Sequence, residues 1–137
     1  ARKAIEETAR RGIRVGAHII LGLPGEDAKE SLRQAPLISS LPLTTLKIHQ
    51  LQIIRGTRLA KMYAEKPFHL YTVEEYIKLI ADYISLLRPD LVLERFVSQS
   101  PPDLLIAPKW GLKNYEFTHR LHNYMKEKLN NKAQSDK

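Results

Sequence analysis

The stretch that decides the fold is Val15–Asp27, which reads VGAHIILGLPGED. Its apolar part, from Val15 to Leu23, is typical of a parallel strand that is covered on both faces. Gly22, Pro24 and Gly25 then predict a tight turn in which the main chain can approach a ligand. In open or barrel-like α/β folds, ligands bind beyond the carboxyl ends of the strands, so we expect a binding site at this turn.

A helix is expected on each side of this strand. Residues 1–11 carry apolar side chains on one face and end at Gly12, a residue suited to a helix C-terminus. Asp27 and Glu30 have the spacing of a capping box and predict a helix directly after the turn, which Pro36 should kink or divide. The sequence opens inside the first helical pattern without an initiator methionine, and we therefore expect a piece of a longer chain.

A second strand is expected at Thr45–Ile54, which reads TLKIHQLQII and is followed by Arg55, Gly56 and Thr57. A strand, a helix and a strand at this spacing form a βαβ unit. The two strands should therefore be parallel and joined by a right-handed crossover.

The remaining sequence predicts a mixture of helices and short strands. In order, we expect a helix at 58–65, an amphipathic helix at 73–87, a strand at 91–97, a short apolar piece at 104–106 and a helix at 114–130. Thr57 is a suitable N-cap, and the spacing of Thr72 and Glu75 is that of a capping box. From Asn130 onward the sequence is polar and is expected to fray.

The composition limits the class of protein. The chain has 137 residues, of which 43% are hydrophobic and 27% charged, as is ordinary for one globular domain. No apolar run approaches the ~20 residues of a membrane helix and no signal peptide is visible, so we expect a cytoplasmic protein without a membrane partner. The absence of cysteine excludes any thiolate site for zinc or an iron–sulfur cluster on this chain, and we expect no metal site.

The formal net charge of +7 suits a polyanionic partner such as RNA, or else a basic surface that is only solvated. Trp110 has two readings as well. It could stack on a base or cover a cavity, or it could plug the edge of the core.

Two histidines are candidates for a substrate pocket. By the two-residue period of strands, His18 shares a face with Ile20, and His49 shares a face with Lys47. If both faces point into one cavity, the histidines lie on adjacent strands and could bind substrate or move protons. The alternative is a pair of histidines that are satisfied inside the fold.

At this point three segments resemble a known family. Gly16–Asp27 looks like the fifth strand of radical S-adenosylmethionine (SAM) enzymes, and Leu46–Thr57 resembles the sixth strand and its exit. Gln99–Asp103 and Ala107–Leu112 resemble the C-terminal extension of an uncharacterised bacterial branch of iron–sulfur oxidoreductases. That branch is similar to the elongator catalytic-subunit group.

The resemblance implies a partial (β/α)₆ barrel of the TIM type that binds SAM and a [4Fe–4S] cluster. The cluster reduces SAM, and the 5′-deoxyadenosyl radical that is released abstracts hydrogen from a substrate. Carried over by position, the residues that would contact the cofactor are Ile20, Gly22, Leu23, Gln52, Ile53 and Ile54. The family spacing would place an acidic residue at Gly25, whereas this sequence has it at Glu26.

The resemblance also implies a fragment, because the cluster cysteines of such enzymes lie in an earlier loop. We expect an α/β fold in which residues 1–58 are the C-terminal portion of the barrel and residues 59–137 are its remaining helix and an extension. No catalytic residue and no tightly bound cofactor is expected on the piece itself. Its expected partners are the missing N-terminal part of the same chain, RNA as substrate, and a second copy through an exposed sheet edge.

Two other readings remain open from the sequence. One is a basic α/β module that binds RNA without catalysis. The other is a structural fragment that has no site of its own.

Overall fold

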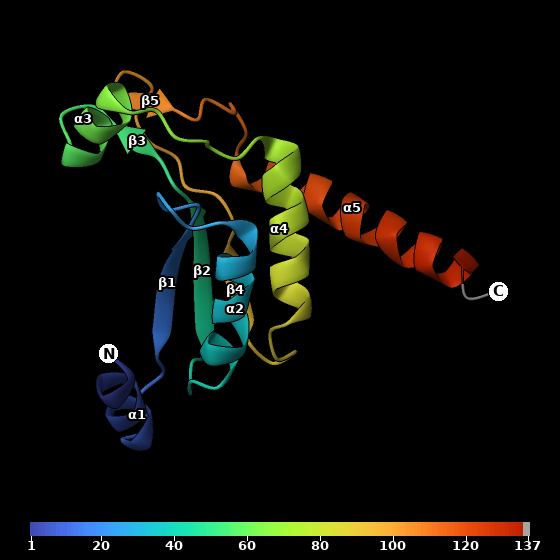
Figure 1. The fold of residues 1–137 in the computed structure, drawn as a ribbon. Helices are drawn as coiled ribbons and strands as arrows, with labels where there is room; N and C mark the ends of the chain where they lie inside the picture. The colour runs from blue at the N-terminus through green and yellow to red at the C-terminus, as the bar shows by residue number, and fades with distance from the viewer. Residues whose placement is uncertain (136–137) are drawn as a thin grey trace.

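A three-stranded parallel sheet with helices against one face forms the centre of the computed structural model, which describes residues 1–135 (Figure 1). In chain order the elements are α1 (Arg2–Arg10), β1 (Gly16–Leu21), α2 (Ala28–Ser39), β2 (Thr45–Gln50), β3 (Ile53–Ile54), α3 (Arg58–Glu65), α4 (Val73–Ser85), β4 (Val92–Arg95), β5 (Leu105–Ala107) and α5 (Asn114–Ser135).

The strands of the main sheet lie in the order β1-β2-β4, and both pairs are parallel. The register of the first pair runs without interruption from Gly16 opposite Thr45 to Leu21 opposite Gln50. The expected parallel βαβ unit is therefore confirmed. Within residues 1–135, β1 has a strand partner on one side only and is an edge of the sheet.

The second predicted strand is divided, which corrects the expectation of one strand over Thr45–Ile54. β2 ends at Gln50, and the amide of Leu51 donates to the carbonyl of Leu21 at 3.0 Å. The chain then leaves the sheet, and β3 pairs antiparallel with β5. The buried positions change parity at the break, from Leu46 and Ile48 in β2 to Leu51 and Ile53 after it. An unbroken strand would keep one parity throughout, so this shift was a local sign that the strand ends near Gln50.

Local helix signals are largely confirmed. The side chains of Asp27, Thr57 and Thr72 each accept a hydrogen bond from the amide three residues later. At Thr72 the capping box is complete, whereas at Asp27 it is half made, because the side chain of Glu30 pairs with Arg33 instead.

Two predictions for the helix ends and interiors need correction. α2 is not divided at Pro36, because the proline lies in the last turn and removes one amide donor near the helix end; a kink there stays a prediction. α5 continues beyond Asn130 to Ser135, and Leu129 is 67% exposed because this part of the helix extends away from the sheet (Figure 1).

The core lies between the sheet and the helices α2, α4 and α5. Tyr76, Ile80 and Tyr83 of α4 are fully buried, and Phe117 and Leu121 of α5 pack in the same cluster. The hydroxyl of Tyr76 donates to the carbonyl of Phe96 at 2.6 Å and fixes α4 to the chain that follows β4. No helix of residues 1–135 combines the length and apolar character required to cross a membrane.

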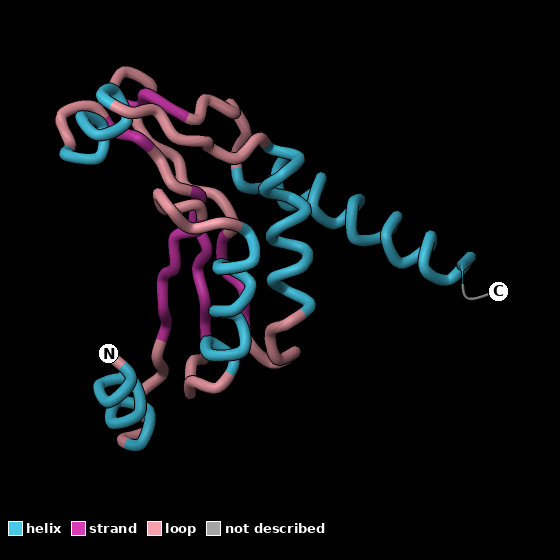
Figure 2. Tube along the Cα trace, viewed as in Figure 1, coloured by secondary structure: helices cyan, strands magenta, loops and turns pink. Residues whose placement is uncertain are grey.

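The opposite face of the sheet is open within the described residues, which corrects the expectation that the first strand is covered on both faces. Along β1, Gly16, His18 and Ile20 are exposed, while Leu21 is fully buried. The helices contribute cover to one face only (Figure 2). A continuous apolar run therefore does not by itself distinguish a strand with two covered faces from one with a single covered face.

Candidate functional site

The open face brings the two candidate histidines together, with His18 in the middle of β1 and His49 near the carboxyl end of β2. The rings of His18 and His49 are tilted by 36° and their centroids are 5.5 Å apart. Ile20 stands opposite His49 in the register and is 47% exposed. An apolar side chain and two imidazoles are thus presented side by side on one surface.

His49 has an unusual environment. Its Nδ1 atom is buried without a hydrogen-bond partner. Burial lowers the pKa of His49 below its ordinary value, and the charges of His18, Arg95 and Lys47 lower it further. Burial and the neighbouring cationic groups therefore disfavour the charged imidazolium, and the buried Nδ1 atom has unused hydrogen-bonding capacity.

Basic side chains continue the open face toward β4. Arg95 is the register partner of Lys47, and the ammonium of Lys47 lies 3.5 Å from the carboxylate of Glu94. Lys47 and Arg95 give the open face a basic rim beside His49 and Ile20. Such a surface favours an anionic or strongly polar ligand over a purely apolar one.

The turn after β1 is held by Tyr71. Gly22 has a φ of +92°, and a Cβ atom built there would lie 3.0 Å from Cε2 of Tyr71. Residues 22–28, Phe68, His69 and Tyr71 line a cavity of about 420 Å³ beside this turn. Leu23 is 43% exposed at its mouth, so the sequence-predicted turn does border a cavity.

Tyr71 is buried at its polar end. Its hydroxyl has no hydrogen-bond partner of good geometry, although Ser31 lies near it. Burial raises the pKa of Tyr71, and the neighbouring carboxylate of Glu26 raises it further. The ring therefore holds the turn through packing.

Glu26 has a structural role in this arrangement. Its Oε1 atom accepts hydrogen bonds from Ser31 at 2.7 Å and from Gln34 at 3.1 Å. Both donors belong to α2, so the carboxylate fixes the turn to the first part of that helix.

The exit of β2 contains three of the residues that the resemblance assigns to the cofactor, and their side chains are engaged within the protein. Ile53 is fully buried, so any contact of this residue with a ligand comes from its main chain. Ile54 is half-buried and belongs to the small antiparallel pair with β5. The side chain of Gln52 donates to the carbonyl of Ser98 at 3.1 Å and accepts from the hydroxyl of Ser100 at 2.7 Å.

A second cavity was not predicted from the sequence. We call it the glutamine pocket; its volume is about 470 Å³, and it is lined by Gln50, Gln52, residues 98–100, Pro102, Leu105 and residues 108–113. Gln50 exchanges two hydrogen bonds with the main chain of Ser98, at 3.1 and 2.9 Å. Gln50 and Gln52 are polar residues in an otherwise apolar segment, which was the only sign of this cavity in the sequence. Their hydrogen-bond partners lie almost 50 residues further along the chain.

Trp110 packs at the edge of the core, as the second interpretation predicted, and stacking on a base stays a prediction. Its indole nitrogen donates to the carbonyl of Tyr71 at 3.2 Å, and its ring packs against Tyr76 with centroids 5.2 Å apart. It thereby closes the edge of the core and at the same time lines the glutamine pocket.

The fold and these sites define an α/β protein with a parallel sheet that is open on one face, with ligand-accessible turns at its carboxyl edge. The family model for the Radical_SAM C-terminal domain matches residues 43–127, which is more than half of the chain. The chain belongs to this family.

The relatives agree with this assignment. The chain is 32% identical over 127 residues to the uncharacterized protein MJ0486 of Methanocaldococcus jannaschii, covering 92% of this chain and 39% of the relative. It is 29% identical over 114 residues to YtqA of Bacillus subtilis (83% and 35%) and 26% identical over 118 residues to YhcC of Escherichia coli K12 (86% and 38%). The chain thus spans less than two-fifths of the length of each of these relatives.

A solved structure shows the same fold. The archaeal Methanocaldococcus infernus Elp3 with a deletion of residues 1–46 superposes with a TM-score of 0.80 and 22% sequence identity. The match covers 93% of this chain and 30% of that one. The mixed α/β architecture is therefore shared with this Elp3 protein.

Proposed function

We propose that this chain is part of a radical SAM enzyme and supplies one side of its cofactor and substrate pocket. The family match and the open sheet face support the proposal together. The face that carries Ile20, His18 and His49 would be part of the barrel interior in the parent protein, where further strands would cover it. Residues 1–58 would be barrel and residues 59–137 its last helix and extension.

The residues present suit the adenosyl part of SAM. Ile20 offers an exposed apolar contact for a flat ring, and the turn at Gly22 and Leu23 offers main-chain groups at the strand end. The main chain of Gln52, Ile53 and Ile54 is the second proposed contact. Bound SAM would supply a 5′-deoxyadenosyl radical after its reduction by a [4Fe–4S] cluster.

The cluster itself would be held by another part of the parent protein. This chain has no cysteine, and among residues 1–135 no three histidine, aspartate or glutamate side chains gather as ligands for a metal ion. The piece is therefore proposed to be inactive alone. Its own contribution is to bind, orient and enclose.

We propose RNA, and transfer RNA in particular, as the substrate class. The net charge of +7 and the basic rim of Lys47 and Arg95 beside the histidines support this choice. His49, whose pKa is lowered by burial, would contact the substrate from this face. A basic module that binds RNA without chemistry is the competing function, and the same rim favours it.

The test uses the full-length protein that contains this chain, with Ile20→Ala as the variant. Val92→Ala is the matched control, because Val92 is also an exposed apolar residue of the open face but lies opposite Thr45, at the amino end of the strands. Ile20→Ala should weaken SAM binding about tenfold through lost apolar contact, while Val92→Ala should leave it unchanged.

The measurement is SAM affinity by equilibrium dialysis, followed by release of 5′-deoxyadenosine. A fully active Ile20→Ala protein, or equal weakening by the two variants, would contradict the proposed site. A parent protein that binds RNA but neither binds nor cleaves SAM would support the module without catalysis.

A further inference from the structure

The glutamine pocket lies apart from the open face. Leu46 and Ile48 of β2 are fully buried beneath the helices, and Gln50 continues that alternation, whereas His49 faces the open side. The pocket therefore begins on the helix side of the sheet. Its volume of about 470 Å³ falls within the range of roughly 300–1,000 Å³ that is typical of small-molecule sites.

The charged residues that line the pocket are all basic. Lys109 and Lys113 both line the pocket, and none of its lining residues carries a carboxylate. Both lysine side chains belong to exposed residues, so they reach the rim from solvent. A ligand with an anionic group at the mouth of the pocket matches this arrangement.

An aromatic wall is already fixed in place. The hydrogen bond from Trp110 to the carbonyl of Tyr71 and the packing of its ring on Tyr76 determine the orientation of the indole. Leu105 and Leu112 add apolar surface to the same lining. A wall of this kind favours a planar, aromatic part of the ligand, as in the stacking platforms that bind nucleobases.

The floor presents preorganised amides. Gln50 and Gln52 each use one N–H group on the carbonyl of Ser98, and each amide nitrogen carries a second N–H. The hydroxyl of Ser100 donates to Gln52 and retains acceptor capacity. These groups can read the donors and acceptors on the edge of a nitrogen base.

We propose that the glutamine pocket binds a nucleotide, with the base between Trp110 and the glutamine amides and the phosphate at Lys109 and Lys113. The lysines distinguish this ligand from SAM, whose sulfonium is cationic and which has no phosphate. The proposal does not depend on SAM chemistry, so its failure and the failure of the proposed function are separable.

The experiment measures binding of a fluorescently labelled AMP to the full-length protein by anisotropy, with unlabelled AMP, adenosine and SAM as competitors. AMP should compete at least tenfold better than adenosine, because only AMP carries the phosphate. SAM should compete no better than adenosine, because it carries the same base but no phosphate. No saturable binding of the probe, or equal competition by AMP and adenosine, would overturn the proposal.

The paired variant is Lys109→Gln with Lys113→Gln, which keeps the stems of both side chains. The double variant should bind AMP about tenfold more weakly, while its affinity for adenosine should not change. Lys126→Gln, an exposed lysine on α5, is the control with the same chemistry and should have no effect. Unaltered AMP affinity in the double variant would overturn the phosphate assignment.

Two sources could supply this nucleotide, and the experiment separates them. A single-stranded RNA octamer that binds more than tenfold tighter than AMP, and loses this advantage in the Lys109→Gln, Lys113→Gln variant, would assign the pocket to one residue of an RNA chain. AMP binding as tight as the octamer would assign it to a free mononucleotide. Either result supports the proposed pocket. If neither AMP nor the octamer binds saturably, the proposal is overturned.

Discussion

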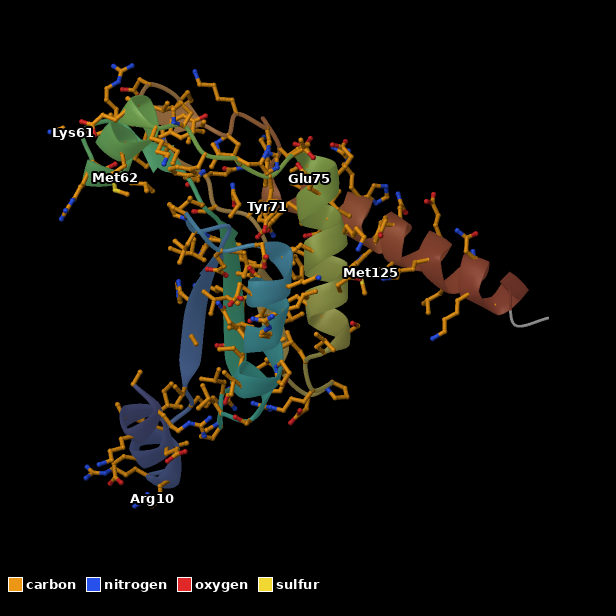
Figure 3. The ribbon with its side chains drawn as sticks, viewed as in Figure 1. Arg10, Lys61, Met62, Tyr71, Glu75 and Met125 are labelled. Carbon is orange, nitrogen blue, oxygen red and sulfur yellow. The ribbon has the colours of Figure 1, made fainter. Side chains whose placement is uncertain are left out.

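Gly22 and Tyr71 lie in direct contact at the carboxyl end of β1, where a Cβ atom on residue 22 would meet the tyrosine ring at 3.0 Å. Figure 3 shows Tyr71 close to the start of α4, so one side chain joins the turn to the chain that leads into the main helix. The glycine is therefore required by a protein contact as well as by its φ of +92°. Gly22→Val would strain the turn even if no cofactor bound there.

The first prediction concerns this ring. Tyr71→Phe should leave the free energy of unfolding unchanged or slightly higher, because the buried hydroxyl has no hydrogen-bond partner to lose. Tyr71→Ala should lower it by about 2 kcal/mol through lost packing on the turn. Urea unfolding of the two variants measures the difference. A phenylalanine variant as unstable as the alanine variant would show that the hydroxyl has a partner after all.

A second prediction follows from His49. Because its pKa is lowered in the folded state, the unfolded chain takes up the proton first as the pH falls. The contribution of His49 to the free energy of unfolding should be fully present above the unfolded pKa of 6.5. It should decrease as the pH drops from there toward the folded pKa. The backbone amide of Thr72 lowers the pKa of Glu75. Protonation of that carboxylate therefore reduces the free energy of unfolding only at a more acidic pH.

The measurement is denaturant unfolding at about pH 7.5 and about pH 5.5. His49→Gln should flatten the difference between the two conditions. His122→Gln removes an exposed histidine from α5 and should retain the difference. Identical pH dependence in both variants would count against a neutral His49.

The third prediction tests RNA at the open face. Affinity of the full-length protein for transfer RNA should fall steeply with salt, and Arg95→Gln should reduce both the affinity and the salt slope. Lys61→Gln on α3 is the control, since that lysine is exposed on a different element (Figure 3). Lys128 is a poor choice for either variant because it is bound to Asp82 at 2.7 Å.

Filter binding over a range of salt concentrations gives the slope. Transfer RNA that does not bind even at low salt would remove RNA from the list of partners. Equal effects of Arg95→Gln and Lys61→Gln would place the contact outside the open face.

The fourth prediction concerns the edge strand β1. An edge with unpaired main-chain groups and an exposed Ile20 recruits further strands, so the 137-residue chain should self-associate as its concentration rises. Ile20→Lys should shift the equilibrium toward monomer. Leu129→Lys replaces an even more exposed apolar residue on α5 and should not. Sedimentation equilibrium measures the molar mass at each concentration. A monomer at every concentration would refute the prediction.

The parts of the fold that depend on neighbouring residues could be predicted from the sequence. Asp27, Thr57 and Thr72 cap helices because a side-chain oxygen reaches an amide three residues away, whatever the rest of the chain does. The proximity of His18 and His49 also followed, since alternation and parallel pairing fix which side chains are neighbours. These inferences needed no long-range contact beyond the βαβ unit.

What could not be predicted depends on distant partners. The end of β2 is set by the hydrogen bond between Leu51 and Leu21 and by the return of β5 beside β3. The glutamine pocket forms only when Gln50 contacts Ser98, and no local sequence pattern predicts this contact. The contact of Tyr71 with Gly22 is of the same kind, because a loop between two helices brings it there.

The hydrogen bonds at Ser98 have a consequence for the motions of the chain. Although Ser98 lies in an irregular segment, its amide donates to Gln50 and its carbonyl accepts from both Gln50 and Gln52. Its exchange with deuterium should therefore be as slow as that of β2 itself, because both become exposed in one cooperative opening. In the hierarchy of local unfolding, the segment after β4 belongs with the sheet, although its backbone looks like a loop.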